Sequence, residues 1–258
     1  MGHSEEDGQY SRAGASPQAR GDAGRPRRRF RPGLPAILFT AFFLPLLLAL
    51  GAWQVDRAGQ KQALYDDFAA GGEPVALEGD SRGLEALRRY APVRASGRYL
   101  ADRQFLLDNM VEDGQAGYRV LTPLRLTEGR AVMVDRGWIP RDFSAAALPM
   151  IQVDENQRTI TGLLDRMPRA GIELDTELAP GWPKVVQFPT FDELSAALGL
   201  ELVPGLVLLD PAMPDGYRRN WRPSDFGPER HIGYAFQWFA LAATLVVLFF
   251  AWSFRKSD

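Results

Sequence analysis

The sequence predicts a membrane α plus antiparallel β protein, with two transmembrane helices flanking a single β-rich, barrel- or sandwich-like extracytoplasmic domain. Three observations support this fold class. Two charge-free apolar runs, residues 32–55 and 232–254, lie near opposite ends of the 258-residue chain. Basic residues flank both runs on their outer sides. Between the runs, short apolar segments alternate with Gly, Pro, Asn and Asp, as is typical of strands and turns.

The first 33 residues predict a disordered tail. They are rich in Gly, Ser, Arg and acidic residues and poor in large aliphatic ones, so they cannot bury enough apolar area to offset the entropy of ordering. The tail ends in a basic cluster: Arg25, Arg27, Arg28, Arg29 and Arg31. Because basic clusters beside a transmembrane helix favour the cytoplasmic side, residues 1–33 are predicted to be cytoplasmic.

Residues 34–54 form the first predicted transmembrane helix. A helix needs about 20 residues to cross a hydrocarbon core of about 30 Å. Pro35 falls in the first turn, where proline is tolerated, and Pro45 is interior and should kink the helix. A cleaved signal peptide is the alternative, since small residues such as Ala49 and Ala52 follow the apolar run. The run exceeds the usual signal-peptide length of about 7 to 15 apolar residues, which favours a retained helix.

Residues 231–254 form the second predicted transmembrane helix. Its ends carry Tyr234, Trp238 and Trp252, ring types that favour the headgroup level. Arg255 and Lys256 close it, so residues 255–258 are predicted to be a cytoplasmic tail. Residues 55–230 are then predicted to lie on the non-cytoplasmic side of a membrane that the chain crosses twice.

Seven runs in this domain read as strands: residues 90–100, 104–109, 118–126, 131–139, 158–167, 184–188 and 202–210. In residues 118–126 apolar side chains alternate with Arg119 and Arg125, which predicts one core face and one wet face. Glu128 and Gly129 fit a hairpin loop. Helices are expected at residues 60–69, continuing the first span, and at residues 191–198, where Thr190 and Glu193 form a capping box before Gly199.

Composition and motifs exclude several functions. The chain has no cysteine and a formal charge of −2, so we expect no disulfide, no thiol chemistry and no nucleic-acid partner. Hydrolase, P-loop and dinucleotide motifs are lacking, and no catalytic residue is assigned. Asp108, Asp135 and Asp210 end strand-like runs and leave a hydrolase as one alternative. The structural alternative is that they satisfy turns, with Asp135 pairing to Arg136.

His231 is the candidate ligand residue. The only other histidine, His3, lies in the polar tail. A helix starting here would place His231, Tyr234 and Trp238 on one face, which suits an axial metal ligand with an aromatic wall for a porphyrin. The helix N-terminus also disfavours imidazolium and so keeps the ring able to coordinate. Ordinary interfacial anchoring is the alternative, and copper carriage is disfavoured without cysteine.

Several motifs, in order, resemble the Surfeit locus protein one family of cytochrome c oxidase assembly factors from bacterial and mitochondrial inner membranes. They lie at residues 51–57, 90–93, 97–100, 107–109, 117–124, 134–140 and 228–242. The sequence departs from the family at Gln60 and Lys61, where many members have tryptophan before the lysine. Residues 163–182 follow no pattern of the family.

The resemblance implies a non-enzymatic assembly factor that handles haem a, with His231 in the position of the family's suggested haem ligand. The implied partners are oxidase subunit I, other oxidase assembly factors and membrane lipid. The implied location is a bacterial inner membrane, multi-pass, with both termini cytoplasmic and a periplasmic domain. Loops such as residues 135–141 would dock on the partner if Trp138 is exposed, whereas a buried Trp138 would belong to the core. A cofactor-free scaffold that stabilises subunit I is the alternative function.

Overall fold

The computed structural model describes residues 28–77, 87–127, 129–145, 147–168, 180–223 and 226–256. The chain divides into two compact units. One extends up to Ala52 and resumes at Phe236, and the other runs from Trp53 to Ala235. Most of the predicted disordered tail lies outside the described residues, as do Glu128 of the hairpin loop and residues 169–179 of the stretch without a family pattern.

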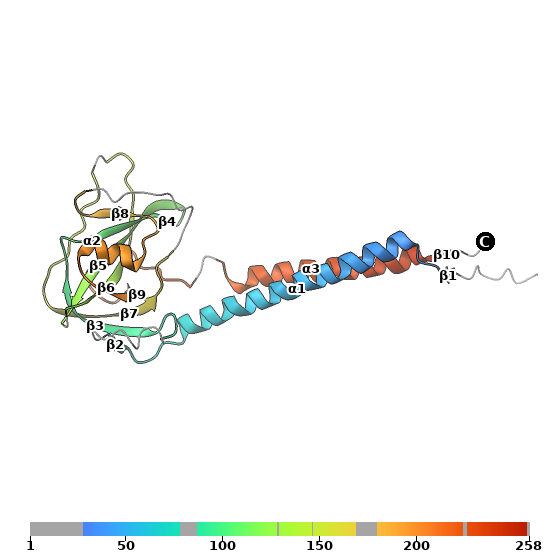
Figure 1. Cartoon of the computed structure of the whole chain (residues 1–258), viewed down its shortest axis with the longest axis horizontal. Coiled ribbons are helices and arrows are strands. Elements are labelled where there is room, and N and C mark those ends of the chain that lie inside the picture. The colour runs from blue at the N-terminus through green and yellow to red at the C-terminus, as the bar shows by residue number, and fades with distance from the viewer. Residues whose placement is uncertain are drawn as a thin grey trace, which may run out of the picture. The chain divides into compact units, whose positions relative to one another are not determined.

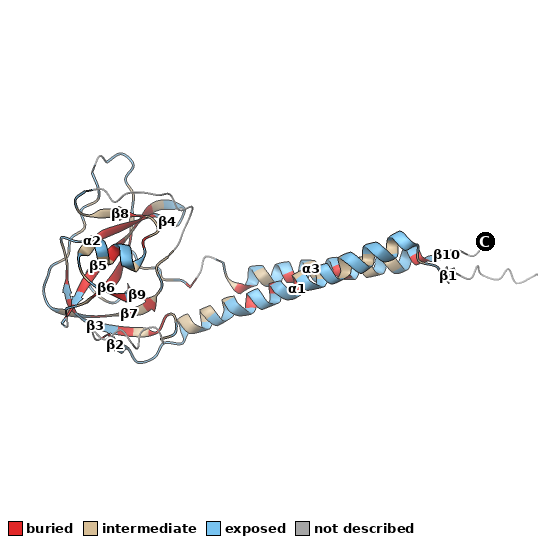
Figure 2. Cartoon of the chain, in the orientation of Figure 1, coloured by how far each residue is buried: buried red, intermediate tan, exposed pale blue. Residues whose placement is uncertain are grey.

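Two long apolar helices flank the strands in chain order (Figure 1). They are α1 (Leu34–Ala69) and α3 (Pro228–Ser253). Both exceed the length of about 20 residues that a bilayer core requires, and each contains an 18-residue window apolar enough to cross a membrane. Few residues of either window are buried, and Figure 2 draws both helices mostly in the colour of exposed residues. This exposed apolar surface is suited to contact with lipid rather than with water.

α1 joins the two helices that were predicted separately at residues 34–54 and 60–69. The residues between them are also helical, and side-chain pairs one turn apart support them. Gln60 Nε2 donates to Asp56 Oδ2 at 2.8 Å, and Arg57 Nη1 donates to Gln60 Oε1 at 2.7 Å. The outer helix is therefore a continuation of the first, as expected.

In the first unit, α1 and α3 approach each other closely at Gly51. A Cβ atom at this position would lie 2.6 Å from Cε1 of Phe239, so any larger residue would require the Phe239 ring to move. Two short strands, β1 (Arg28–Phe30) and β10 (Phe254–Lys256), pair antiparallel directly before α1 and directly after α3. Neither strand was predicted, because three residues carry no readable alternation.

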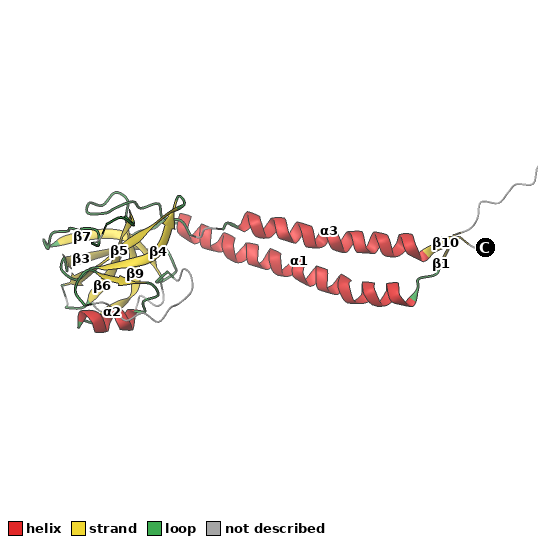
Figure 3. Ribbon diagram, turned by 90° about the horizontal axis from the view of Figure 1, so that it is seen from above, coloured by secondary structure: helices red, strands yellow, loops and turns green. Residues whose placement is uncertain are grey.

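The second unit contains an eight-stranded sheet that closes into a barrel (Figure 3). Its strands are β2 (Val75–Leu77), β3 (Pro92–Tyr99), β4 (Phe105–Glu112), β5 (Gln115–Leu126), β6 (Ala131–Pro140), β7 (Arg158–Asp165), β8 (Lys184–Val186) and β9 (Leu202–Leu209). The strands follow the order β3–β7–β9–β6–β5, and β5 pairs in turn with β3, where Gly97 lies opposite Leu126. This last pairing closes the barrel. β4 pairs with the other half of β5, so the long strand β5 has both β3 and β4 as neighbours along one edge.

We expected a purely antiparallel sheet, but the sheet is mixed. β2 pairs parallel with β3, β8 with β4, and β9 with β6. Neighbours joined by a hairpin, such as β5 and β6, must be antiparallel. β8 and β9 follow longer connections, and these allow parallel pairing.

Two hydrophobic cores use opposite faces of the same strands. Val132 and Val134 of β6 point to the core inside the barrel, and Ala131 and Met133 point to an outer core with Leu194 of the helix α2 (Phe191–Leu198). β5 is likewise covered on both faces, since Leu121 is as buried as the residues on its inner face. The predicted wet face of residues 118–126 is therefore wrong over most of its length, although Arg125 is exposed.

Local signals predicted the elements of this unit well. Each of the seven predicted strand runs contains most or all of an observed strand, from β3 to β9. α2 (Phe191–Leu198) has the predicted capping box, in which Glu193 N donates to Thr190 Oγ1 at 3.2 Å and Thr190 N donates to Glu193 Oε2 at 2.7 Å. Gly199 ends the helix in the left-handed conformation, with φ 62°.

Candidate functional site

His231 lies in the first turn of α3, three residues after Pro228. Proline suits this position because its fixed φ matches a helix start and its missing N–H is not needed there. The side chain is half-buried, and Nδ1 lies 2.8 Å from Oε1 of Gln54 on α1. Gln54 itself is 9% exposed. The second unit therefore holds the predicted ligand residue against a buried amide of the other long helix.

The other two predicted site residues follow His231 on the same helix. Tyr234 belongs to the same unit and is 46% exposed, so its ring has a free surface. Trp238 is half-buried and belongs to the other unit. Helical spacing places both rings on the side of α3 that carries His231. A joint role for the three residues stays a prediction.

Sequence reasoning missed Gln54, although a signal was present. Within the charge-free residues 32–55 it is the only amide side chain. A polar side chain in such a run is costly unless it finds a partner. This cost could have marked Gln54 as half of a pair, but nothing local identifies the other half, because His231 lies 177 positions away.

Hydrogen bonds fasten residues 221–223, which lie between β9 and α3, to the barrel. Tyr90 Oη donates to the carbonyl of Pro223 at 3.1 Å, and the Tyr90 ring packs edge-on against Phe68 of α1 at 5.1 Å. Trp221 Nε1 donates to the carbonyl of Leu209 at 2.8 Å. The side chain of Tyr90 therefore contacts both the outer end of α1 and the approach to α3.

β6 provides a second attachment for the same segment. Trp138 N donates to the carbonyl of Arg218 at 2.7 Å, and Arg218 N returns a hydrogen bond at 3.2 Å. Gly137 makes this pairing possible. Its φ is +111°, and a Cβ atom there would lie 2.5 Å from the Arg218 oxygen.

Trp138 is a core residue, which agrees with the buried alternative and not with docking of a partner through this ring. The ring is 4% exposed, and Nε1 donates to the carbonyl of Met110 at 3.0 Å. Arg218 covers the ring, with its guanidinium carbon 4.8 Å from the ring centre. The residue satisfies its own donor within the domain and offers little surface to another protein.

Asp135 pairs with Arg119 and not, as suggested, with Arg136. Asp135 is fully buried, and its Oδ2 accepts from Arg119 Nη1 at 2.9 Å while Oδ1 accepts from Gly137 N at 3.0 Å. Burial raises the pKa of this carboxyl, whereas Arg119 and the Gly137 N–H act in the opposite direction. Successive residues of a strand point to opposite faces of the sheet, so the side chains of Asp135 and Arg136 point away from each other and do not pair.

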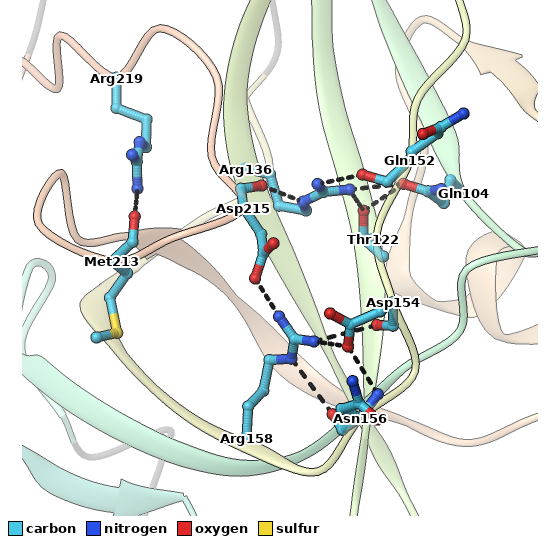
Figure 4. A network of polar contacts seen from close by, with 10 residues as sticks. All are labelled: Gln104, Thr122, Arg136, Gln152, Asp154, Asn156, Arg158, Met213, Asp215 and Arg219. Carbon is cyan, nitrogen blue, oxygen red and sulfur yellow. Dashed lines mark hydrogen bonds and ion pairs between the residues drawn. The ribbon is translucent and has the colours of Figure 1, made fainter.

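Arg136 of β6 is buried, and its guanidinium is the centre of a polar network (Figure 4). Its partners are neutral oxygens: Asp215 O at 2.7 Å, Gln152 O at 2.9 Å, Gln104 Oε1 at 3.0 Å and Thr122 Oγ1 at 3.4 Å. Burial lowers the pKa of this guanidinium. Nearby, Arg158 binds Asp215 and Asp154. The network ties the segment before α3 to β5, β6 and β7 and to Gln104, which directly precedes β4.

Asp108 and Asp210 also have structural partners. Both oxygens of Asp108 accept from Arg141 Nη1, at 3.1 and 3.2 Å, and Asp210 Oδ1 accepts from Ala212 N at 2.8 Å. These contacts agree with the structural alternative for the three acids. In the described part of the chain, no group of three or more His, Asp or Glu residues could hold a metal ion.

A family model places the chain among known proteins, because the SURF1 family model matches residues 41–243. The chain belongs to the SURF1 family. This is the family of the resemblance noted from the motifs, and it is generally linked to cytochrome c oxidase assembly. The matched range includes both Gln54 and His231.

Curated SURF1-like proteins resemble the chain, two of the three described here over most of its length. An uncharacterized SURF1-like protein of Mycobacterium tuberculosis is 26% identical over 242 residues, which cover 88% of each chain. A SURF1-like protein of Rickettsia bellii is 24% identical over 220 residues, 79% of this chain and 85% of the relative. One from Dictyostelium discoideum is 30% identical over 112 residues, 39% of this chain and 42% of the relative.

Proposed function

We propose that this SURF1-family protein spans a bacterial inner membrane twice, with its barrel domain in the periplasm, and assists haem a insertion into subunit I of cytochrome c oxidase. Family membership supports the link to oxidase assembly. The observation that carries the haem role is the contact of His231 Nδ1 with Gln54. It engages one ring nitrogen and leaves the other available as an axial ligand.

The residues around His231 suit a transiently held haem. Haem iron accepts an imidazole nitrogen as axial ligand, and a porphyrin needs apolar surface beside that ligand. Ile232 and Tyr234 follow His231 on α3 and are 58% and 46% exposed. His231 would supply an imidazole nitrogen to the iron, and these side chains would offer apolar area. A single ligand at an exposed surface allows release to a partner.

The same helices support the proposed membrane location. A single apolar side chain on a soluble protein is ordinary, but α1 and α3 expose apolar residues along many turns. Lipid is the solvent in which such surfaces are stable. Subunit I is itself expected to receive its haem within the membrane, so a ligand at the outer end of α3 would lie at a suitable depth.

The test is the visible spectrum of the full chain, purified in detergent from cells that make haem a. Wild-type protein should carry a haem signal, His231→Ala should lose most of it, and His3→Ala, the matched control, should keep it. Retention of the signal in His231→Ala would refute His231 as ligand. Absence of haem from all three proteins, with oxidase assembly still dependent on the chain, would favour the cofactor-free scaffold.

A further inference from the structure

We propose that Gln54 is a positioning residue for His231: its amide oxygen accepts the Nδ1 proton, fixes the ring orientation and presents Nε2 as the coordinating atom. Because this role presupposes the haem site proposed above, it deepens that site rather than adding another. Gln54 does not itself bind the metal. It acts through His231, from a different helix.

The donor and acceptor inventory determines the direction of this hydrogen bond. An amide oxygen can only accept, so the 2.8 Å contact of Gln54 Oε1 requires a proton on Nδ1 of His231. In the neutral ring the other nitrogen, Nε2, then carries the lone pair. Ligating histidines commonly donate their second ring N–H to an oxygen acceptor, which sets both tautomer and orientation.

Burial makes the contact an effective constraint. Gln54 is 9% exposed, so water competes poorly for its oxygen, and a buried acceptor without a donor would be costly. Both residues belong to the same compact unit, with Tyr90 joining Phe68 of α1 to the segment before α3. The pairing therefore depends on the folded domain and not only on helical spacing.

An amide suits a delivery protein better than a carboxylate would. A carboxylate on Nδ1 raises the basicity of the imidazole and strengthens its bond to a metal. Gln54 fixes the geometry without that charge. The ligand is thus oriented for capture yet weak enough for transfer.

The tautomer is measurable without any haem. In protein labelled with ¹⁵N-histidine and carrying His3→Ala, His231 gives the only imidazole signals, recorded by NMR at about pH 9, where an ordinary imidazole is neutral. We expect the Nδ1–H form to dominate. Gln54→Leu should shift the ring toward the Nε2–H form or a mixture, while Gln62→Leu, an exposed amide on the same helix, should change nothing. An Nε2–H ring in the starting protein, or an unchanged ring in Gln54→Leu, overturns the role.

Haem binding provides the second readout. Gln54→Leu should weaken haem affinity by about 10- to 100-fold, the usual effect of removing such a partner. Gln54→Glu keeps the size and the acceptor, so it should bind haem and lower its reduction potential. Equal affinity of wild type and Gln54→Leu would overturn the positioning role while leaving the haem site intact. Failure of wild type to bind haem would refute the haem site, and the NMR result would still decide the pairing.

Discussion

Two buried tyrosines of the barrel domain differ in one hydrogen bond. Tyr90 Oη donates to the carbonyl of Pro223, whereas Tyr99 Oη has no partner within the part of the chain that the structure describes. Burial raises the pKa of both phenols to about 12. Tyr99 lies between the guanidiniums of Arg136 and Arg158, 5.6 and 5.1 Å from its ring centre. The Tyr99 ring therefore makes favourable contacts with both cations, whereas its buried hydroxyl makes no hydrogen bond with the described residues.

Removing each hydroxyl separately should therefore have opposite effects on stability. Tyr90→Phe should lower the free energy of unfolding by about 0.5–1.5 kcal/mol, because it leaves the Pro223 carbonyl without its donor. Tyr99→Phe should be neutral or stabilising by up to about 1 kcal/mol, because it removes an unsatisfied buried group. Thermal unfolding of the full chain in detergent, followed by circular dichroism, measures both. Equal destabilisation by the two variants would contradict the assigned contacts.

At the scale of elements, β6 organises the domain. It lies between β5 and β9, contributes to both cores and pairs at its far end with the segment that leads to α3. Short-range patterns predicted β6 and α2, because alternation and capping are local properties. They could not predict the parallel pairing with β9 or the partner of Asp135, since both depend on residues brought together only by the closed barrel.

Gly137 is the position where this organisation is most sensitive. Gly137→Ala should cost more than about 2 kcal/mol, because the left-handed φ and the nearby Arg218 oxygen both oppose a Cβ atom. Hydrogen exchange of residues 215–223 should increase. Gly199→Ala is the matched control, with φ +62° but open space around it, and should cost only about 1 kcal/mol. Similar costs and exchange in both variants would show that the Arg218 contact is unimportant.

At the scale of the whole molecule, composition predicted two apolar helices and a β-rich domain between them, and the structure has both. The distribution of basic residues also predicts which side of the membrane the termini and the domain occupy, and the fold alone does not test that orientation. His231 was identified because the chain has only two histidines. Its partner Gln54 required the folded domain, since the two lie on different helices and far apart in the sequence.

The natural absence of cysteine makes the orientation testable. Val111→Cys, at a residue that is 67% exposed in β4, should react with a membrane-impermeant maleimide in intact spheroplasts. Ser257→Cys, beyond the second helix, should react only after the membrane is permeabilised. The opposite pattern would invert the topology, and labelling of both in intact spheroplasts would mean that α3 does not span.

The central claim is that this chain promotes haem a incorporation into cytochrome c oxidase through His231. Its most direct test is the reduced-minus-oxidised spectrum of membranes from a deletion strain complemented with wild type, His231→Ala or His3→Ala at matched protein levels. We expect a diminished haem a signal in the deletion strain, restoration by wild type and His3→Ala, and little restoration by His231→Ala. An undiminished signal in the deletion strain, or full restoration by His231→Ala, would contradict the claim.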